Sequence, residues 1–207
     1  EYYSEDPFLS STMVVNAITG LQRTGTFPYL KHFALNPTEN HRNYLYNWCT
    51  DQALRETYLK SFQKAIEVAD CMGLMTSYGR IGICYTGGSE ALIEGVARQE
   101  WGFKGVIVTD YSYDNKFMNI DHGLRAGNDL GMGSKLNYMG ADYSFNYSDS
   151  ATPRIQKQLK KAVKHACFAY AHTQLINKNW NEYIKDHPDE GKTIDSAVII
   201  DSWNWWK

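Results

Sequence analysis

The side chains best suited to chemistry are polar residues that directly follow short apolar runs. They are Lys31 and His32, Ser77 and Tyr78, Asp110, and Asn128 and Asp129. In α/β proteins function collects at the carboxyl ends of parallel strands, so we expect these side chains to meet on one rim. A carboxylate, a cation, an imidazole and a phenol together offer hydrogen-bond donors and acceptors, which suits a polyhydroxylated ligand such as a sugar.

Asp110 is the strongest single candidate for a functional residue because of the strand that precedes it. The run 105–109 is β-branched and apolar on both faces. Such a strand must be covered on both sides, as in a parallel sheet wrapped by helices. The position favours a functional carboxylate at the mouth of the sheet. The alternative is an N-cap for a segment that starts near Ser112.

Two other polar motifs favour structural roles. Asp129 lies between Gly127 and Gly131 and is expected to bond the turn around them. The sequence Gly-Gly-Ser at 87–89 lacks the spacing and the following Lys of a phosphate-binding loop. We therefore expect a turn there, with Ser89 capping the next helix.

The elements that must position these residues alternate along the chain. Strands are expected at 27–34, 74–78, 105–110 and 126–132. Helices are expected from Ser4 or Asp6 to Gly25, over 51–72 with Gly73 as the stop, from Ser89 to Gly102, and from Thr152 and Pro153 to about Tyr170. Alternating strands and helices indicate an α/β fold with a parallel sheet. Four strands cannot close an eight-stranded barrel, so either the sheet is open and doubly wound or another segment completes it.

Composition and charge exclude several classes of function. The 207 residues are 43% hydrophobic and 21% charged, as in an ordinary globular protein. The net charge of -2 shows no basic excess, so nucleic acid is not an expected partner. The four cysteines form no CxxC pair and no zinc pattern, and unpaired thiols indicate a reducing compartment. With no signal-peptide pattern at the acidic first residues, we expect a cytoplasmic or cell-associated protein.

The chain divides into two expected parts. Residues 1–176 would form one barrel-like unit, with a polar loop over 134–150. Residues 177–207 would be a C-terminal extension that packs on the surface or leads to a further segment. Its end carries Trp203, Trp205 and Trp206, a cluster like the aromatic belt at a membrane interface. A membrane is therefore expected only through a segment beyond this sequence.

Six stretches resemble glycoside hydrolase family 3, the β-glucosidase family, in the same order along the chain. They are YYSEDPFLSSTM (2–13), KHFALNPTENHR (31–42), ALRETYLKSF (53–62), LMTSYG (74–79), EWGFKGVIVTDY (100–111) and AGNDLGM (126–132). The resemblance implies the C-terminal half of a (β/α)8 TIM-type barrel, completed by another chain or segment.

The resemblance also implies the role of each site residue. Asp110 would be the nucleophile that forms a glycosyl-enzyme intermediate. The implied substrate-binding residues are Lys31, His32, Arg42, Met75, Tyr78 and Tyr111. Among them, Tyr78 would orient the nucleophile, and Tyr111 stands where the family usually has Trp. No metal and no cofactor are implied.

The implied activity is that of a retaining exo-β-glycosidase that removes terminal β-D-glucosyl residues from a β-glucoside or cello-oligosaccharide. The family's proton donor is a Glu on an α/β sandwich domain, and no region here resembles that domain. A complementing chain with this domain and the first barrel strands is therefore expected. The stretch 31–37 lacks the His loop of the family's N-acetylglucosaminidases. The alternatives are β-xylosidase specificity, a non-catalytic sugar-binding remnant, and an open sheet with a nucleotide ligand, which the lack of a Gly-rich fingerprint disfavours.

Overall fold

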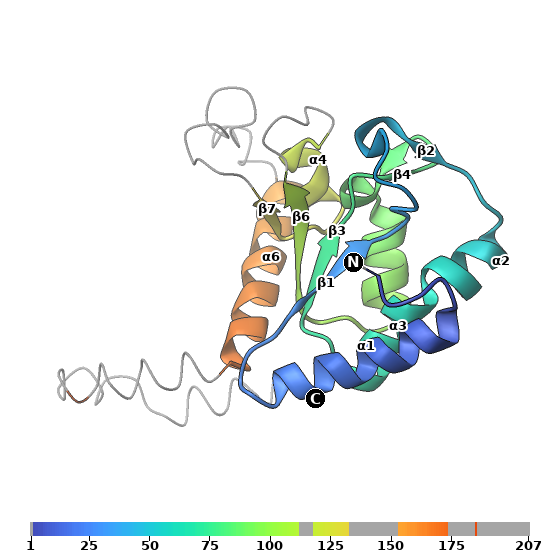
Figure 1. Ribbon diagram of the computed structural model, residues 1–207. Helices are drawn as coiled ribbons and strands as arrows, with labels where there is room; N and C mark the ends of the chain where they lie inside the picture. The colour runs from blue at the N-terminus through green and yellow to red at the C-terminus, as the bar shows by residue number, and fades with distance from the viewer. Residues whose placement is uncertain (1, 112–117, 133–152, 174–184, 186–207) are drawn as a thin grey trace.

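The chain folds around a four-stranded parallel sheet. The computed structural model describes residues 2–111, 118–132, 153–173 and 185. Strands β1 (Tyr29–Phe33), β3 (Gly73–Thr76), β6 (Val106–Tyr111) and β7 (Leu130–Met132) lie side by side in this order, and every neighbouring pair is parallel. Their carboxyl ends point to the same end of the molecule (Figure 1). The predicted α/β fold with a parallel sheet is confirmed.

Helices connect the strands in the predicted alternation. Helix α1 (Pro7–Gln22) precedes β1, α3 (Lys60–Ala69) leads into β3, and η4 (Ala91–Glu100) leads into β6. Helix α4 (Ile120–Arg125) precedes β7, and α6 (Pro153–Ala171) follows it and contacts β6 and α4. In Figure 1, α1 and α3 run below the sheet and α6 runs beside β6 and β7.

Helix α1 begins and ends as its sequence predicts. The carboxylate of Asp6 accepts a hydrogen bond of 2.7 Å from the backbone N–H of Leu9, and Pro7 occupies the first turn. A short side chain that accepts from this position replaces a missing intrahelical partner. The helix ends at Gln22, and Gly25 follows with a φ of 78°, which glycine adopts at no steric cost.

The main core lies between three helices and the sheet. Helix α3 buries residues at i, i+3, i+4 and i+7, the spacing that lines one face of a helix. These side chains meet others from α1, η4 and the two central strands. The largest members of this core are Ile18, Phe33, Leu59, Phe62, Ile66, Leu74, Leu92, Ile93, Trp101, Phe103 and Ile107. Burial of this apolar surface is the main stabilising contribution to the fold.

The helix expected over 51–72 is divided. Helix α2 (Asp51–Ala53) is capped by Thr50, and η2 (Leu54–Tyr58) follows with a wider turn, in which the N–H of Leu59 bonds the carbonyl of Leu54. Helix α3 then ends at Ala69, earlier than expected.

Gly73 is not the helix stop that the sequence indicated. Asp70 ends the helix in the left-handed region, with a φ of 48°. Gly73 instead begins β3, and a Cβ there would lie 2.7 Å from the carbonyl oxygen of Pro28. The glycine serves the close approach of β1 and β3.

The fourth strand is shorter than expected, since only Leu130–Met132 pair with β6. The N–H of Ala126 bonds the carbonyl of His122, and Gly127 turns the chain with a φ of 96°. Residues 126–129 therefore form the exit from α4, an element that the sequence did not predict.

A second, small sheet stands toward the carboxyl ends of the main strands (Figure 1). It joins β2 (Tyr46–Asn47), β4 (Arg80–Ile81) and β5 (Cys84–Tyr85). Strands of two residues carry no periodicity, which is why the sequence did not reveal them. The 3-10 turn η1 (Arg42–Tyr44) precedes β2, and η3 (Thr86–Gly88) follows β5.

The expected turn at 87–89 is confirmed. The hydroxyl of Ser89 accepts a hydrogen bond of 3.3 Å from Leu92 N–H, and a Cβ on Gly88 would meet the ring of Tyr85. The four cysteines are unpaired, as expected. The loop at 134–150, Thr152 and the C-terminal extension except Lys185 lie outside the described residues.

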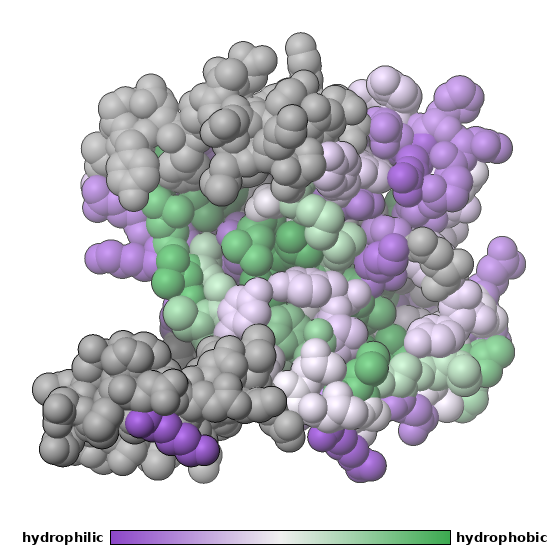
Figure 2. All heavy atoms as spheres, turned by 60° about the vertical axis from the view of Figure 1, so that its left-hand side comes forward, coloured by the Kyte–Doolittle hydropathy of each residue, from purple (hydrophilic) through white to green (hydrophobic). Residues whose placement is uncertain are grey.

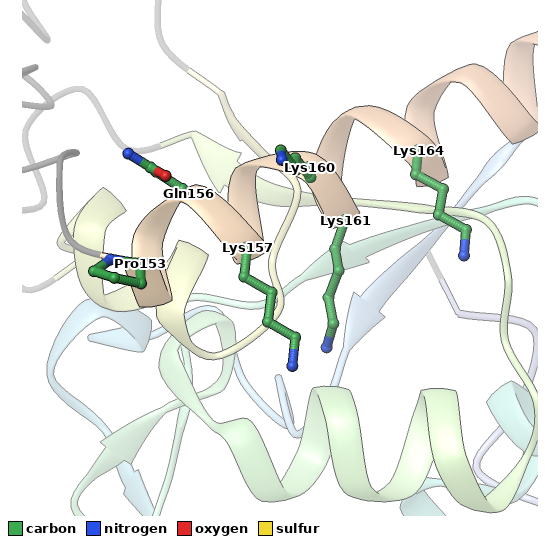
Figure 3. A pocket seen from close by; sticks show the side chains of 6 residues that line it. All are labelled: Pro153, Gln156, Lys157, Lys160, Lys161 and Lys164. Carbon is green, nitrogen blue, oxygen red and sulfur yellow. The ribbon is translucent and has the colours of Figure 1, made fainter.

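Helix α6 carries a basic pocket of about 370 Å³. It is lined by Pro153, Gln156, Lys157, Lys160, Lys161 and Lys164. Figure 3 shows Lys157, Lys161 and Lys164 extending from α6 on the side of η4, where Lys161 pairs with Glu94 at 3.1 Å. Within the parts of the chain that the structure describes, no helix is long and apolar enough to cross a membrane.

Candidate functional site

Asp110 lies near the carboxyl end of β6 with most of its side chain shielded from solvent. Every residue from Val106 to Asp110 is buried, as the apolar run before it predicted. Only 13% of the Asp110 side chain is exposed. Its Oδ1 accepts a hydrogen bond of 2.7 Å from the backbone N–H of Tyr111. The carboxylate is therefore held in place by its own strand. The segment after Tyr111 that it was alternatively expected to cap lies outside the described residues.

His32 brings the end of β1 against this carboxylate. Its Nε2 lies 3.4 Å from Oδ2 of Asp110, and the imidazole is almost fully buried. On the other side of the ring, Nδ1 lies 3.1 Å from the hydroxyl of Tyr2. The same hydroxyl accepts a 3.3 Å hydrogen bond from the backbone N–H of His32. The phenol, imidazole and carboxylate thus form a continuous row.

Tyr78 and Arg42 form a second side of the site. The guanidinium of Arg42 lies over the Tyr78 ring, 4.6 Å from its centroid, a favourable cation–π contact. Burial, and secondly the negative charge of Asp110, raise the pKa of Tyr78 to about 12, although Arg42 acts in the opposite direction. The phenol therefore keeps its proton at neutral pH and can donate a hydrogen bond.

Arg42 is itself held by an acidic neighbour. Its Nη1 lies 2.8 Å from Oε2 of Glu39, and Oε1 of the same carboxylate accepts a 2.9 Å hydrogen bond from Asn36. Because Glu39 is mostly exposed, this ion pair contributes little to stability. Its effect is to orient the guanidinium over Tyr78.

The remaining expected site residues reach the same region from three strands. Met75 pairs in register with Val108, two residues before Asp110, and is half-buried. Lys31 precedes His32 on β1 and has an exposed side chain. Tyr111 follows Asp110 and is 38% exposed. The structure thus joins Asp110, His32, Tyr78 and Arg42 by contact or electrostatic coupling, and it puts Lys31, Met75 and Tyr111 next to them.

Asp129 has the structural role that the sequence favoured, but with different partners. Its Oδ2 lies 2.6 Å from Nη2 of Arg98 and accepts a 2.8 Å hydrogen bond from the N–H of Ile107. Its Oδ1 lies 2.8 Å from Nδ1 of His165. The partners come from η4, β6 and α6, so this carboxylate joins distant elements rather than its own turn.

Sequence reasoning missed two residues that contact the site. Tyr2 was part of a matching stretch but had no role assigned, and Glu39 lay unremarked between the KH pair and Arg42. Tyr2 and His32 are 30 positions apart, and no spacing rule connects them. A short-range signal did exist for Glu39, which stands three residues before Arg42.

Comparison with known proteins gives a consistent family assignment. The model of the glycosyl hydrolase family 3 N terminal domain matches residues 1–169. A β-glucosidase from Ruminococcus albus is 39% identical over 111 residues, which are 54% of this chain and 12% of that protein. An exo-α-(1→6)-L-arabinopyranosidase from Bifidobacterium breve is 35% identical over 115 residues, covering 56% of this chain and 15% of that protein.

The solved structures agree with the sequence comparison. β-Glucosidase 3B from Thermotoga neapolitana, solved in complex with glucose, superposes with a TM-score of 0.77 at 28% identity. The match covers 86% of this chain and 25% of that one. This chain therefore spans a quarter or less of the length of each of these three relatives.

Proposed function

The chain belongs to glycosyl hydrolase family 3, and we propose that it is the nucleophile-bearing part of a retaining exo-β-glycosidase of the β-glucosidase type. The observation that carries the proposal is the buried carboxylate of Asp110, which lies near the end of β6 with His32 and Tyr78 around it. The Ruminococcus relative named above is a β-glucosidase, and the Thermotoga relative was solved with glucose. The proposed substrate is a β-glucoside or cello-oligosaccharide.

In the proposed reaction, an oxygen of Asp110 attacks the anomeric carbon of the terminal sugar. The bond from that carbon to the leaving-group oxygen breaks, and the leaving oxygen takes a proton from a separate acid. Water then attacks the anomeric carbon of the glycosyl-enzyme, gives its proton to the conjugate base of that acid, and releases the Asp110 carboxylate. The protonated phenol of Tyr78 suits this sequence, because it can donate a hydrogen bond to the nucleophile without adding a second negative charge.

The other polar side chains would hold the sugar. Lys31 and Arg42 are donors only, and His32 can donate through Nε2, whereas the carboxylate oxygens of Asp110 can only accept. Sugar hydroxyls need both kinds of partner, and fixed contacts of this kind help to distort and hold the ring. Met75 and Tyr111 would supply apolar walls against which the ring faces pack.

We further propose that residues 1–176 form the C-terminal half of a (β/α)8 barrel, which a complementing chain or segment completes. The main sheet has four parallel strands, half the number of such a barrel. Helix α1 also exposes apolar side chains, of which Phe8 is 80% exposed. Figure 2 shows apolar surface in the middle and at the lower right of the face that it presents. The complementing part would also supply the acid/base Glu, and residues 177–207 would be an extension outside the barrel.

The test is the Asp110→Ala variant, assayed together with the complementing segments. We expect kcat/KM for an aryl β-glucoside to fall by about 10³-fold or more, because the attacking group is lost. Added azide, which can occupy the vacated space, should restore turnover and yield a glycosyl azide of inverted anomeric configuration. Asp121→Asn removes a carboxylate with 45% side-chain exposure and is the matched control. Undiminished activity of Asp110→Ala would defeat the proposal.

The same protein with its complementing segments also tests two alternative functions. Stronger hydrolysis of an aryl β-xyloside than of the glucoside would indicate a xyloside as the substrate. A relative with a different sugar specificity is known, since the Bifidobacterium protein is named as an arabinopyranosidase. Glucose binding that depends on His32 and Arg42, without any turnover, would favour a sugar-binding remnant.

A further inference from the structure

Tyr2 makes three contacts with His32, a residue of the proposed site. Its hydroxyl accepts a hydrogen bond from the backbone N–H of His32 at 3.3 Å and lies 3.1 Å from Nδ1 of the same residue. The two rings meet edge to face, with centroids 6.3 Å apart. Tyr2 therefore contacts both the backbone of His32, which lies in β1, and its side chain, and so constrains the orientation of the imidazole.

The hydrogen bonds available to the imidazole favour one tautomer. Nε2 of His32 lies 3.4 Å from Oδ2 of Asp110. An ionised carboxylate oxygen can only accept, so a hydrogen on Nε2 is the arrangement that this contact favours. The Tyr2 oxygen already accepts from the backbone N–H and keeps its own hydrogen to donate. That hydrogen meets a lone pair on Nδ1 if the imidazole is neutral. The hydrogen bond at one ring nitrogen sets which nitrogen is protonated.

We propose that Tyr2 is a positioning residue that holds His32 as the neutral Nε2–H tautomer with this N–H directed at Asp110. In a ligand-bound state, the same N–H would be offered to a sugar hydroxyl at a fixed angle. The proposed tautomer is inferred from the contacts of His32 with Tyr2 and Asp110. Its consequence for turnover rests on the function proposed above.

The chain offers a matched pair of variants to test this role. Tyr2→Phe removes only the hydroxyl and keeps the ring that packs against His32. Tyr3→Phe removes the same group from the next residue, which has nearly the same exposure, 51% against 50%. Both are compared with the unmodified protein together with its complementing segments, after histidine is labelled with ¹⁵N. A His32→Gln sample identifies the signals of His32.

The first measurement is the pair of ¹⁵N shifts of the His32 ring. In the unmodified protein and in Tyr3→Phe, we expect Nε2 to have the shift of a protonated nitrogen and Nδ1 that of an unprotonated one. In Tyr2→Phe, we expect both shifts to move toward intermediate values, as two tautomers exchange. Unchanged shifts in Tyr2→Phe, at an unchanged melting temperature, would overturn the proposal. A purely structural role of Tyr2 would lower the melting temperature without changing the tautomer.

The second measurement is the hydrolysis of an aryl β-glucoside. Loss of an aligned hydrogen bond predicts a fall in kcat/KM of about tenfold for Tyr2→Phe, against less than about twofold for Tyr3→Phe. Equal values for the two variants would overturn the catalytic consequence. If the unmodified protein hydrolyses no glycoside, the proposed function fails, and the ¹⁵N shifts still decide whether Tyr2 sets the tautomer.

Discussion

At the scale of single residues, the site places the Asp110 carboxylate near a phenol, Tyr78, that keeps its proton. Burial raises the pKa of Tyr78 to about 12, and the nearby Asp110 charge acts in the same direction. A phenol that stays protonated can support an anionic nucleophile, whereas a phenolate would repel it. The same environment predicts a measurable dependence of stability on pH.

Stability is expected to fall in alkaline solution because of Tyr78. Its folded pKa is raised above the value of 10.0 in the unfolded chain, so the folded state binds more protons between about pH 10 and pH 12. The contribution of Tyr78 to the unfolding free energy is fully present below pH 10 and is lost as the pH rises through 12. The loss due to this residue is about 2 kcal/mol. Urea unfolding between pH 9 and 12 measures it.

Tyr78→Phe should make this alkaline decline less steep by the part due to Tyr78, while Tyr29 and Tyr85, whose pKa values are also raised by burial, keep their part. Tyr58→Phe, which alters a phenol that is 41% exposed, is the comparison. If the unfolding free energy of both variants falls with pH as steeply as that of the unmodified protein, burial does not raise the pKa of Tyr78.

At the scale of elements, the strands approach one another so closely that some positions admit only glycine. A Cβ on Gly105 would collide with the carbonyl group of Met72, which accepts a hydrogen bond from Val106 N–H at 2.9 Å. The entries to β3 and β6 are therefore in backbone contact. The positions of Met75 and Asp110 along these strands depend on that contact.

Gly105→Ala is expected to lower stability by about 2 kcal/mol or more, because the backbone of Met72 has to move. Gly20→Ala is the matched control, since nothing lies within 4 Å of a Cβ at this position in α1. Alanine there should raise stability by about 0.5–1 kcal/mol, through its higher helix propensity. Thermal unfolding distinguishes the two, and opposite signs are expected. A neutral Gly105→Ala would contradict the close approach.

At the scale of the whole molecule, a cluster of buried charges joins helix α6 to the sheet. Asp129 is 2% exposed in its side chain and contacts Arg98 of η4 and His165 of α6, and it also accepts from the backbone of β6. Burial lowers the pKa of Arg98, which Asp129 counteracts. A buried cation that loses its counter-ion is costly.

Asp129→Asn is accordingly expected to lower the unfolding free energy by about 3 kcal/mol or more. Asp121→Asn breaks an exposed pair with Arg125, whose side chains are 45% and 41% exposed, and should cost less than about 1 kcal/mol. Urea unfolding at pH 7 compares the two variants under identical conditions. Similar losses would mean that the buried cluster contributes no more than a surface ion pair.

The order of the main elements and the strand ends that bear the site can be predicted from local sequence patterns. Buried parallel strands leave continuous apolar runs in the chain, amphipathic helices leave a period of 3.6 residues, and caps such as Asp6 act within a few residues. For the same reason the apolar run before Asp110 was enough to mark that residue. Family resemblance then added Arg42 and Met75, which no local pattern indicated.

Which side chains meet depends on the packing of distant elements and could not be predicted from local patterns. The contacts of Tyr2 with His32 and of Asp129 with Arg98 and His165 join residues 30 or more positions apart. Gly73 likewise resembled a helix stop until β1 was seen to pass against it. Local propensity acts over a few residues, whereas these contacts depend on how the helices and strands pack. Neighbours along the chain therefore predict the elements, and the packed sheet determines the site.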